Sequence, residues 1–318
     1  MPEVSVIIVC MNRPDILFPC LDSLRAHTSL PYEVLVVAYR FSPDNLALLR
    51  TNYPSIRVVL SDEIRGFSEN NNLALAQARG RYCFVVNDDT LMHMPVIDRL
   101  VADLAALPEN AAAISPCIRF ADGRIQTCGR APWTARRYAK HYLHLVDESR
   151  SGPWNQLPAG YVAQVLEGTY PAGSVFQTYT LNGACFLIKT EAFKRVGWFD
   201  ERFFFTPEDI ALGHALNDAG YTVWADPSVE ITHLAGGSVS RMEAAIKPAR
   251  VRGSLIFYGE PLWLRCFIWC FEALRAFKYL FLPRTERNRL MTQTARNVMR
   301  TAFSSASPKE LFIRFSHE

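Results

Sequence analysis

Short apolar runs alternate with amphipathic stretches along the first part of the chain. The runs at 4–10, 33–38, 56–60 and 82–86 are rich in β-branched and aliphatic residues, as buried strands are. Helical periodicity covers about 15–27, 43–52 and 68–78 between them. This alternation predicts parallel strands joined by crossover helices, and hence an α/β fold with a Rossmann-like, twisted, mainly parallel sheet flanked by helices.

The residues that follow each predicted strand are the first candidates for chemistry, because such sheets bind ligands beyond the carboxyl ends of their strands. They are Met11, Asn12 and Arg13 after the first strand, Ala38, Tyr39 and Arg40 after the second, and Asn87, Asp88, Asp89 and Thr90 after the fourth. Adjacent carboxylates repel one another unless a cation or donors lie nearby, so Asp88 and Asp89 indicate a divalent metal. Spacing alone also fits a solvated turn and helix cap before Pro95.

The pattern loosens over 119–178, which is rich in Gly, Pro, aromatic and basic residues and has no clear period. A segment of this length favours an excursion on the acceptor side of the site over a plain connector. Order returns at 179–188, and a strand-like run at 229–232 precedes His233. We therefore predict one domain over 1–240 and a C-terminal helical extension over 241–318.

The extension contains an apolar aromatic stretch at 262–282 that is interrupted by Arg265, Glu272, Arg275 and Lys278. These charges argue against a transmembrane helix, which needs about 20 predominantly apolar residues. Helices packed on the domain and an amphipathic surface in a membrane interface both fit this pattern.

The amino-acid composition limits the kinds of protein to which this chain could belong. With 318 residues, 49% hydrophobic and 20% charged, the chain can bury a sizeable core. A net charge of +3 is too small to indicate nucleic-acid binding. The eight cysteines show no paired metal-ligand spacing and favour a reducing, cytoplasmic setting, and the N-terminus lacks the features of a signal peptide.

Seven motifs occur in a fixed order along the chain. They are Met11-Asn12, Gly66-Phe67 with Asn70-Asn71-Asn72, the Asn-Asp-Asp of 87–89, Asn182-Gly183-Ala184, Gly197-Trp198-Phe199-Asp200-Glu201, Glu208-Asp209, and Thr232-His233. This series resembles the inverting GT-A-fold glycosyltransferases of family 2, particularly their rhamnosyltransferase-like members. The resemblance covers roughly residues 4–238.

The resemblance implies a metal-dependent transfer of a sugar from a nucleotide diphosphate donor. Asp89 would ligate the metal directly, Asp88 would bind metal or donor ribose, and Asn87 would contribute its amide. His233 would be a further ligand, which favours Mn²⁺ over Mg²⁺ because imidazole is uncommon around Mg²⁺.

The resemblance also assigns the proton transfer and the substrate contacts. Asp209 would be the general base for the acceptor hydroxyl, and Glu208 would orient the acceptor or the base. The remaining predicted substrate-binding residues are Asn12, Arg13, Tyr39, Gly66, Asn72, Trp198 and Asp200. Trp198 fits a sugar-stacking or a core position.

One position departs from the family. The second strand usually ends in a carboxylate that contacts the pyrimidine of the donor, whereas this chain has Ala38. Alanine cannot accept that hydrogen bond. Either Tyr39 stacking or Arg40 would hold the base differently, or the donor nucleotide is unusual, or activity is reduced.

The function implied is transfer of a hexose or deoxyhexose such as rhamnose to a glycan or lipid-linked acceptor in surface polysaccharide synthesis. The protein would work in the cytoplasm, with peripheral contact at the inner face of the cell membrane through the extension. The alternative is a degenerate member that binds nucleotide sugar or glycan without catalysis. Nucleotidyl transfer would need a Gly-rich phosphate loop after the first strand, which 11–14 does not supply.

Overall fold

The computed structural model describes residues 1–130, 132–145, 175–234, 242–283 and 285–317. Much of the predicted excursion, at 131 and 146–174, lies outside the described residues, as does the predicted boundary near residue 240.

The predicted alternation forms the first half of the sheet. Its elements are β1 (Val4–Cys10), α1 (Pro14–Ala26), β2 (Tyr32–Tyr39), α2 (Pro43–Asn52), β3 (Arg57–Ser61), α3 (Phe67–Leu75) and β4 (Tyr82–Val86). The strands lie side by side in the order β3-β2-β1-β4, all parallel. The third helix ends earlier than the expected residue 78, because the N–H groups of Gln77 and Ala78 bond to carbonyls three residues back and tighten the chain into a turn.

The second half of the sheet is mixed. Its elements are β5 (Thr90–Met92), α4 (Val96–Ala106), β6 (Ala111–Phe120), β7 (Ile125–Thr127), α5 (Ala135–Tyr142), β8 (Phe176–Thr178), β9 (Cys185–Lys189), α7 (Thr190–Arg195), α8 (Glu208–Asp218) and β10 (Thr222–His233). The sheet continues β4-β9-β6-β10-β5, and β9 is antiparallel to both of its neighbours. Strands β6 and β10 therefore run in the same direction as β1–β4, and their carboxyl ends lie at the same edge.

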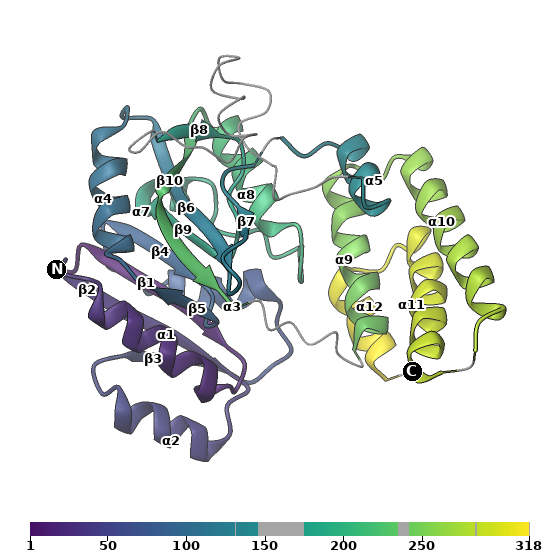
Figure 1. The fold of residues 1–318 in the computed structure, drawn as a ribbon, viewed down its shortest axis with the longest axis horizontal. Helices are drawn as coiled ribbons and strands as arrows, with labels where there is room; N and C mark the ends of the chain where they lie inside the picture. The colour runs from purple at the N-terminus through teal and green to yellow at the C-terminus, as the bar shows by residue number, and fades with distance from the viewer. Residues whose placement is uncertain (131, 146–174, 235–241, 284, 318) are drawn as a thin grey trace.

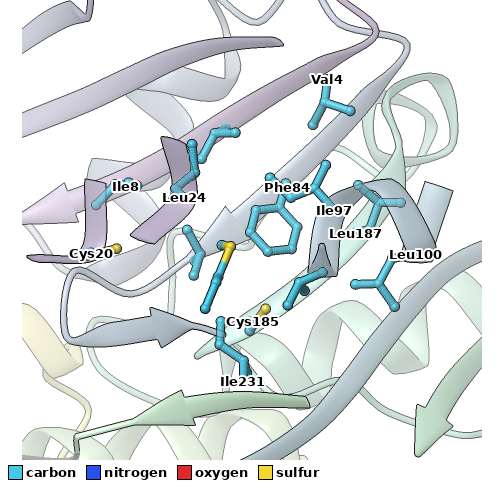
Figure 2. Packing of buried hydrophobic residues seen from close by; sticks show 14 of the residues in the cluster. Val4, Ile8, Cys20, Leu24, Phe84, Ile97, Leu100, Cys185, Leu187 and Ile231 are labelled. Carbon is cyan, nitrogen blue, oxygen red and sulfur yellow. The ribbon is translucent and has the colours of Figure 1, made fainter. Parts of the chain in front are cut away.

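Apolar side chains cover both faces of the sheet, which confirms the predicted α/β class. On one face, side chains of α1 and α4 pack against β1, β4 and β9 around Phe84, Leu100 and Leu187 (Figure 2). On the other face, α3, α7 and α8 enclose a cluster that contains Phe186, Phe193 and Phe199. Burial of these side chains is the main term that holds the helices on the sheet.

The C-terminal extension is helical, as expected. It comprises α9 (Glu243–Phe257), α10 (Leu262–Leu280), α11 (Glu286–Ala302) and α12 (Pro308–Ser316). Helix α5 leaves the sheet domain and packs with these helices (Figure 1), where Tyr138 and Tyr142 contact the cluster around Val251, Leu264 and Ile268. Among the described residues, no helix has the length and hydrophobicity needed to cross a membrane.

A buried carboxylate joins three of these helices. Glu272 of α10 is fully buried, and its Oε1 accepts a hydrogen bond from Lys247 of α9 at 2.8 Å. Arg275 donates to the same carboxylate at 2.9 Å, and the Tyr142 hydroxyl of α5 donates to it as well. Two cations thus depend on one carboxylate, and its removal would leave them without a counter-charge in a poorly solvated site.

We expect Glu272→Ala to lower the free energy of unfolding by about 3 kcal/mol, the usual cost of breaking a buried ion pair from one side. The control is Glu191→Ala, because the Glu191 side chain is 87% exposed in its pair with Lys194 and such pairs contribute less than about 1 kcal/mol. Urea unfolding of both variants measures the difference. Equal losses would show that the buried network does not hold the helices together.

Candidate active site

The two predicted metal ligands lie at the carboxyl edge of the sheet. Asp89 follows β4, and His233 ends β10, whose antiparallel pairing with β5 sets His233 opposite Thr90. The His233 Nε2 lies 3.0 Å from the Asp89 Oδ1, and their side chains are 12% and 22% exposed. Asn87 brings its amide to 3.5 Å from the same Nε2. The structure therefore gathers residues that are about 145 positions apart in the sequence.

Gln126 of β7 fixes the tautomer of His233. The His233 Nδ1 lies 2.8 Å from the Gln126 Oε1, and an amide oxygen only accepts, so Nδ1 carries the proton. The Nε2 lone pair then faces the Asp89 carboxylate. Two atoms that both carry lone pairs repel each other at 3.0 Å unless a proton or a cation lies between them. Gln126 was not identified from the sequence, because it lies in the segment without a period.

A divalent cation fits this arrangement. Cis ligands of an octahedral ion bound at about 2.1 Å lie about 3 Å apart. Burial, together with the charge of Asp89, raises the pKa of Asp88 to about 6, against a hydrogen bond from the Cys10 thiol and the charge of Arg13. No group of three His, Cys, Asp or Glu side chains in the described part of the chain could hold a metal alone. An ion at Asp89 and His233 would therefore take further ligands from a bound diphosphate or water.

The helix-cap interpretation of residues 87–90 is wrong. Thr90 opens the strand β5, and α4 begins only at Val96. The Thr90 hydroxyl donates to the carbonyl of Asn87 at 2.9 Å. This hydrogen bond closes the turn over residues 87–90, which holds Asp88 and Asp89 at the sheet edge.

A second acidic cluster lies at the N-terminus of α8. The Asp209 Oδ2 accepts from the Arg130 guanidinium at 2.8 Å and from the Gly183 N–H at 3.1 Å. The Glu208 side chain is buried, and its Oε2 has no hydrogen-bond partner among the described residues. Burial, followed by the charge of Asp209, raises the pKa of Glu208 well above its usual range. Donors from Arg130 and Gly183 therefore hold Asp209, whereas burial opposes the ionisation of Glu208.

The segment before β9 connects the two clusters. The Asn87 N–H donates to the carbonyl of Ala184 at 2.9 Å, and Gly183 beside it bonds Asp209. Because β9 is antiparallel, its start lies at the edge where β4 ends. Candidate metal ligands and candidate base thus share one edge of the sheet.

Residues 5–153 match the family described as Glycosyl transferase family 2. The chain carries a family 2 glycosyltransferase domain. Its relatives include the "O-antigen biosynthesis protein RfbC" of Myxococcus xanthus, which is 31% identical over 255 residues. That match covers 78% of this chain but only 18% of the relative, so the chain spans less than a fifth of that protein.

A second relative is similar over most of its length. It is the "N-acetylglucosaminyl-diphospho-decaprenol L-rhamnosyltransferase" of Mycobacterium tuberculosis, which is 28% identical over 252 residues. The match covers 76% of this chain and 78% of that enzyme.

Solved structures share the fold of the glycosyltransferase domain. A mannosyltransferase from Pyrobaculum calidifontis, solved with GDP-Man and Mn²⁺, has a TM-score of 0.53 at 18% identity, over 99% of this chain and 79% of that one. GalNAc-T7, solved with UDP, GalNAc and Mn²⁺, has a TM-score of 0.58 at 14% identity, over 76% of this chain and 45% of that one. The fold is that of GT-A glycosyltransferases, with C-terminal helices added.

Three predicted donor contacts of the glycosyltransferase domain follow β1 and β2 at the same edge. Asn12, at a positive φ of 53°, accepts from the Ser42 N–H at 2.9 Å and so ties the β1 loop to α2. Arg13 pairs with Asp15 in solvent. The Tyr39 hydroxyl accepts from the Arg65 N–H at 3.3 Å. Ala38 is 1% exposed and offers no polar group to a base.

Three further predicted residues, Asn72, Trp198 and Asp200, surround a different pocket of about 610 Å³. Asn72 exchanges two hydrogen bonds with the backbone of Phe199, and Asp200 binds Arg202. Neither Asp89 nor Asp209 lines this pocket. Sugar contact by these residues stays a prediction.

Gly66 has a packing role in this structure. A Cβ at Gly66 would come within 2.1 Å of the Phe204 carbonyl oxygen, and the Phe67 N–H bonds that oxygen at 3.0 Å. Only glycine allows this approach, which holds the start of α3 against the segment that leads to Asp209.

A larger pocket, of about 680 Å³, lies between α5, α9, α10 and α11. Thr206, two residues before Glu208, forms part of its wall, and Lys247, Arg250 and Arg275 contribute cations. Helix α9 reaches this point because Gly253 lets it approach Thr206, whose carbonyl oxygen would lie 2.2 Å from an added Cβ. The helical extension therefore borders the acidic cluster of the glycosyltransferase domain. The sequence indicated no pocket here.

We expect His233→Ala and Gln126→Ala each to weaken Mn²⁺ binding, by about tenfold or more, because one removes a ligand and the other its orientation. Electron paramagnetic resonance of free Mn²⁺, with and without UDP, GDP or dTDP, measures the affinity. His93→Ala is the matched control, since His93 is exposed. Unchanged Mn²⁺ affinity in both variants would exclude His233 as a ligand.

Proposed function

We propose that the chain is an inverting, metal-dependent glycosyltransferase that moves a hexose or deoxyhexose such as rhamnose from a nucleotide diphosphate donor to a glycan or lipid-linked acceptor in surface polysaccharide synthesis. The contact of Asp89 with His233 at the carboxyl edge of the sheet carries the proposal. The names of the two relatives, in O-antigen biosynthesis and in rhamnosyl transfer to a diphospho-decaprenol, support the substrate class. We place the reaction in the cytoplasm, at the inner face of the membrane.

Asp89 and His233 would hold the divalent ion, Mn²⁺ before Mg²⁺, with Asp88 beside them for the metal or the donor ribose. When bound, such an ion neutralises the negative charge that develops on the leaving diphosphate. Asn87 contributes its amide to the donor. Asn12, Arg13 and Tyr39 contact the nucleotide from the ends of β1 and β2, where Tyr39 or Arg40 replaces the contact that Ala38 lacks.

Asp209 is the general base of this proposal. It takes the proton of the acceptor hydroxyl while the hydroxyl oxygen bonds to the anomeric carbon. The bond from that carbon to the donor diphosphate breaks on the opposite face, and its electron pair leaves with the diphosphate, so the configuration inverts. Arg130 and Gly183 hold the Asp209 Oδ2, and Ile210 donates to the Oδ1 at 2.7 Å. The second lone pair of Oδ1 remains for the acceptor.

The acceptor would approach through the pocket beside Thr206. This pocket borders the Glu208 and Asp209 cluster and carries Arg250, which suits the phosphate of a lipid-linked acceptor. Lys247 on the same wall is held by Glu272. Glu208, which is buried next to Asp209 in the first turn of α8, orients the base or the acceptor in this proposal. Trp198, Asp200 and Asn72 would contact a sugar from the separate pocket that they line, and Gly66 would act by packing the start of α3.

Donor binding is tested first. In a thermal-shift screen of UDP-, GDP- and dTDP-sugars with Mn²⁺, a true donor raises the melting temperature, because it binds the folded state alone. The shift should require Mn²⁺ and should vanish in Asp89→Asn. Absence of any Mn²⁺-dependent shift would contradict the proposed donor site.

Asp209→Asn should then reduce sugar transfer by about 10²–10⁴-fold, the usual contribution of a general base, while the donor shift with Mn²⁺ persists. Glu208→Gln is the matched comparison and should retain far more transfer, since it keeps the shape of a carboxyl with a raised pKa. Full turnover in Asp209→Asn would remove Asp209 as the base. A donor shift without transfer in the unaltered protein would favour the non-catalytic alternative.

A further inference from the structure

The outward face of α10 is apolar along its whole length. Of the eight exposed positions described on this helix, seven are apolar and the eighth is Lys278. The apolar ones are Leu262, Trp263, Cys266, Trp269, Cys270, Leu274 and Phe277, and Phe281 follows at the cap. We call these eight residues the α10 stripe. Leu274, Phe277 and Phe281 are 69%, 59% and 74% exposed, which is unusual for a soluble surface.

The charges that interrupt this stretch in the sequence point away from the stripe. The Arg265 Nε donates to the carbonyl of Ala302 on α11 at 2.7 Å, and Arg275 binds the buried Glu272. Of the two arrangements that the sequence left open, the structure shows the packing of α10 on its neighbouring helices. The inner face of α10 packs on the neighbouring helices (Figure 1). Its outer face stays apolar.

Cations of α11 lie near the C-terminal end of α10. Arg289 and Arg296 are exposed and line a pocket of about 670 Å³ with Tyr279 and Leu282, which lie at the end of α10. Neither arginine forms an ion pair within the described residues, and no acidic residue described there lines the pocket. An exposed apolar face on one helix, with unpaired cations on the helix packed against it, matches the surface of a membrane with anionic headgroups.

We propose that the α10 stripe inserts into the headgroup region of a bilayer that contains anionic phospholipids, with Arg289, Arg296 and Lys278 on the lipid phosphates. Trp263 and Trp269 suit this depth, because indole rings favour the membrane interface. A second copy of the chain is a poorer occupant, since it would set the same arginines against one another. The inference deepens the membrane contact of the proposed function and rests on it.

The position of the stripe also suits an acceptor held in the membrane. The opposite side of α10 contributes Phe271, Arg275 and Tyr279 to the pocket that borders Thr206. One helix thus lies between the bilayer and the proposed acceptor pocket. An acceptor anchored in the same leaflet could reach the pocket without leaving the membrane.

Co-sedimentation with vesicles tests the proposal. The full chain should pellet with vesicles of phosphatidylcholine and phosphatidylglycerol in equal parts, and much less with phosphatidylcholine alone or at high salt. Trp269→Ser with Phe277→Ser, and separately Arg289→Glu with Arg296→Glu, should each lower the bound fraction at least tenfold. The controls are Leu48→Ser and Arg50→Glu on α2, which are equally exposed but lie far from α10 (Figure 1).

Two outcomes would overturn the proposal. One is a failure of the binding test, in which either the wild-type chain stays in solution with anionic vesicles or the variants bind as well as the wild type. The other is a dimer in light scattering that the stripe variants convert to monomer. The donor thermal shift with Mn²⁺, read on the same preparations, separates this result from failure of the transferase proposal, because all stripe variants should retain it.

Discussion

The antiparallel pairing of β10 with β5 is the constraint on which the candidate site depends. It sets His233 opposite Thr90, and therefore 3.0 Å from Asp89 in the turn that precedes Thr90. A slip of one residue would turn the imidazole to the other face of the sheet. The same strand pairs with β6 on its other side and so cannot shift alone. The backbone ladders, rather than contacts between the ligands themselves, thus hold two lone-pair-bearing groups at a distance that suits a cation.

A second constraint separates the two neighbouring carboxyls of α8. Both lie at a helix N-terminus, which stabilises negative charge, yet only Asp209 receives donors from Arg130 and Gly183. Glu208 is buried without a partner for its Oε2 among the described residues, so its ionisation is opposed by burial. Two neighbouring carboxyl groups therefore differ: donors hold Asp209 in place, whereas burial disfavours the charge of Glu208.

The sequence predicted well what depends on local periodicity and poorly what depends on distant contacts. The bounds of β1, α2 and β4 follow from apolar runs and turn residues alone. Arg130 and Gln126 could not be found in this way, because each lies in a segment without a period and reaches its partner across the sheet edge. Similarly, the motif predicts Asn72 as a substrate contact but gives no sign of the two hydrogen bonds between its amide and the Phe199 backbone. A motif gives the order of residues, and the tertiary contacts decide which atoms remain free.

Tertiary contacts also determine which face of α10 turns toward the protein. Its sequence holds apolar residues on all sides, so periodicity does not determine which face turns inward. Glu272 determines it, since a carboxylate in this position must face Lys247 and Tyr142, which lie on α9 and α5. Once Glu272 and Arg275 point inward, Leu274 and Phe277 on the other side of the helix must point outward. The buried ion pair that binds the extension together is therefore also the reason that the extension presents an apolar surface to its surroundings.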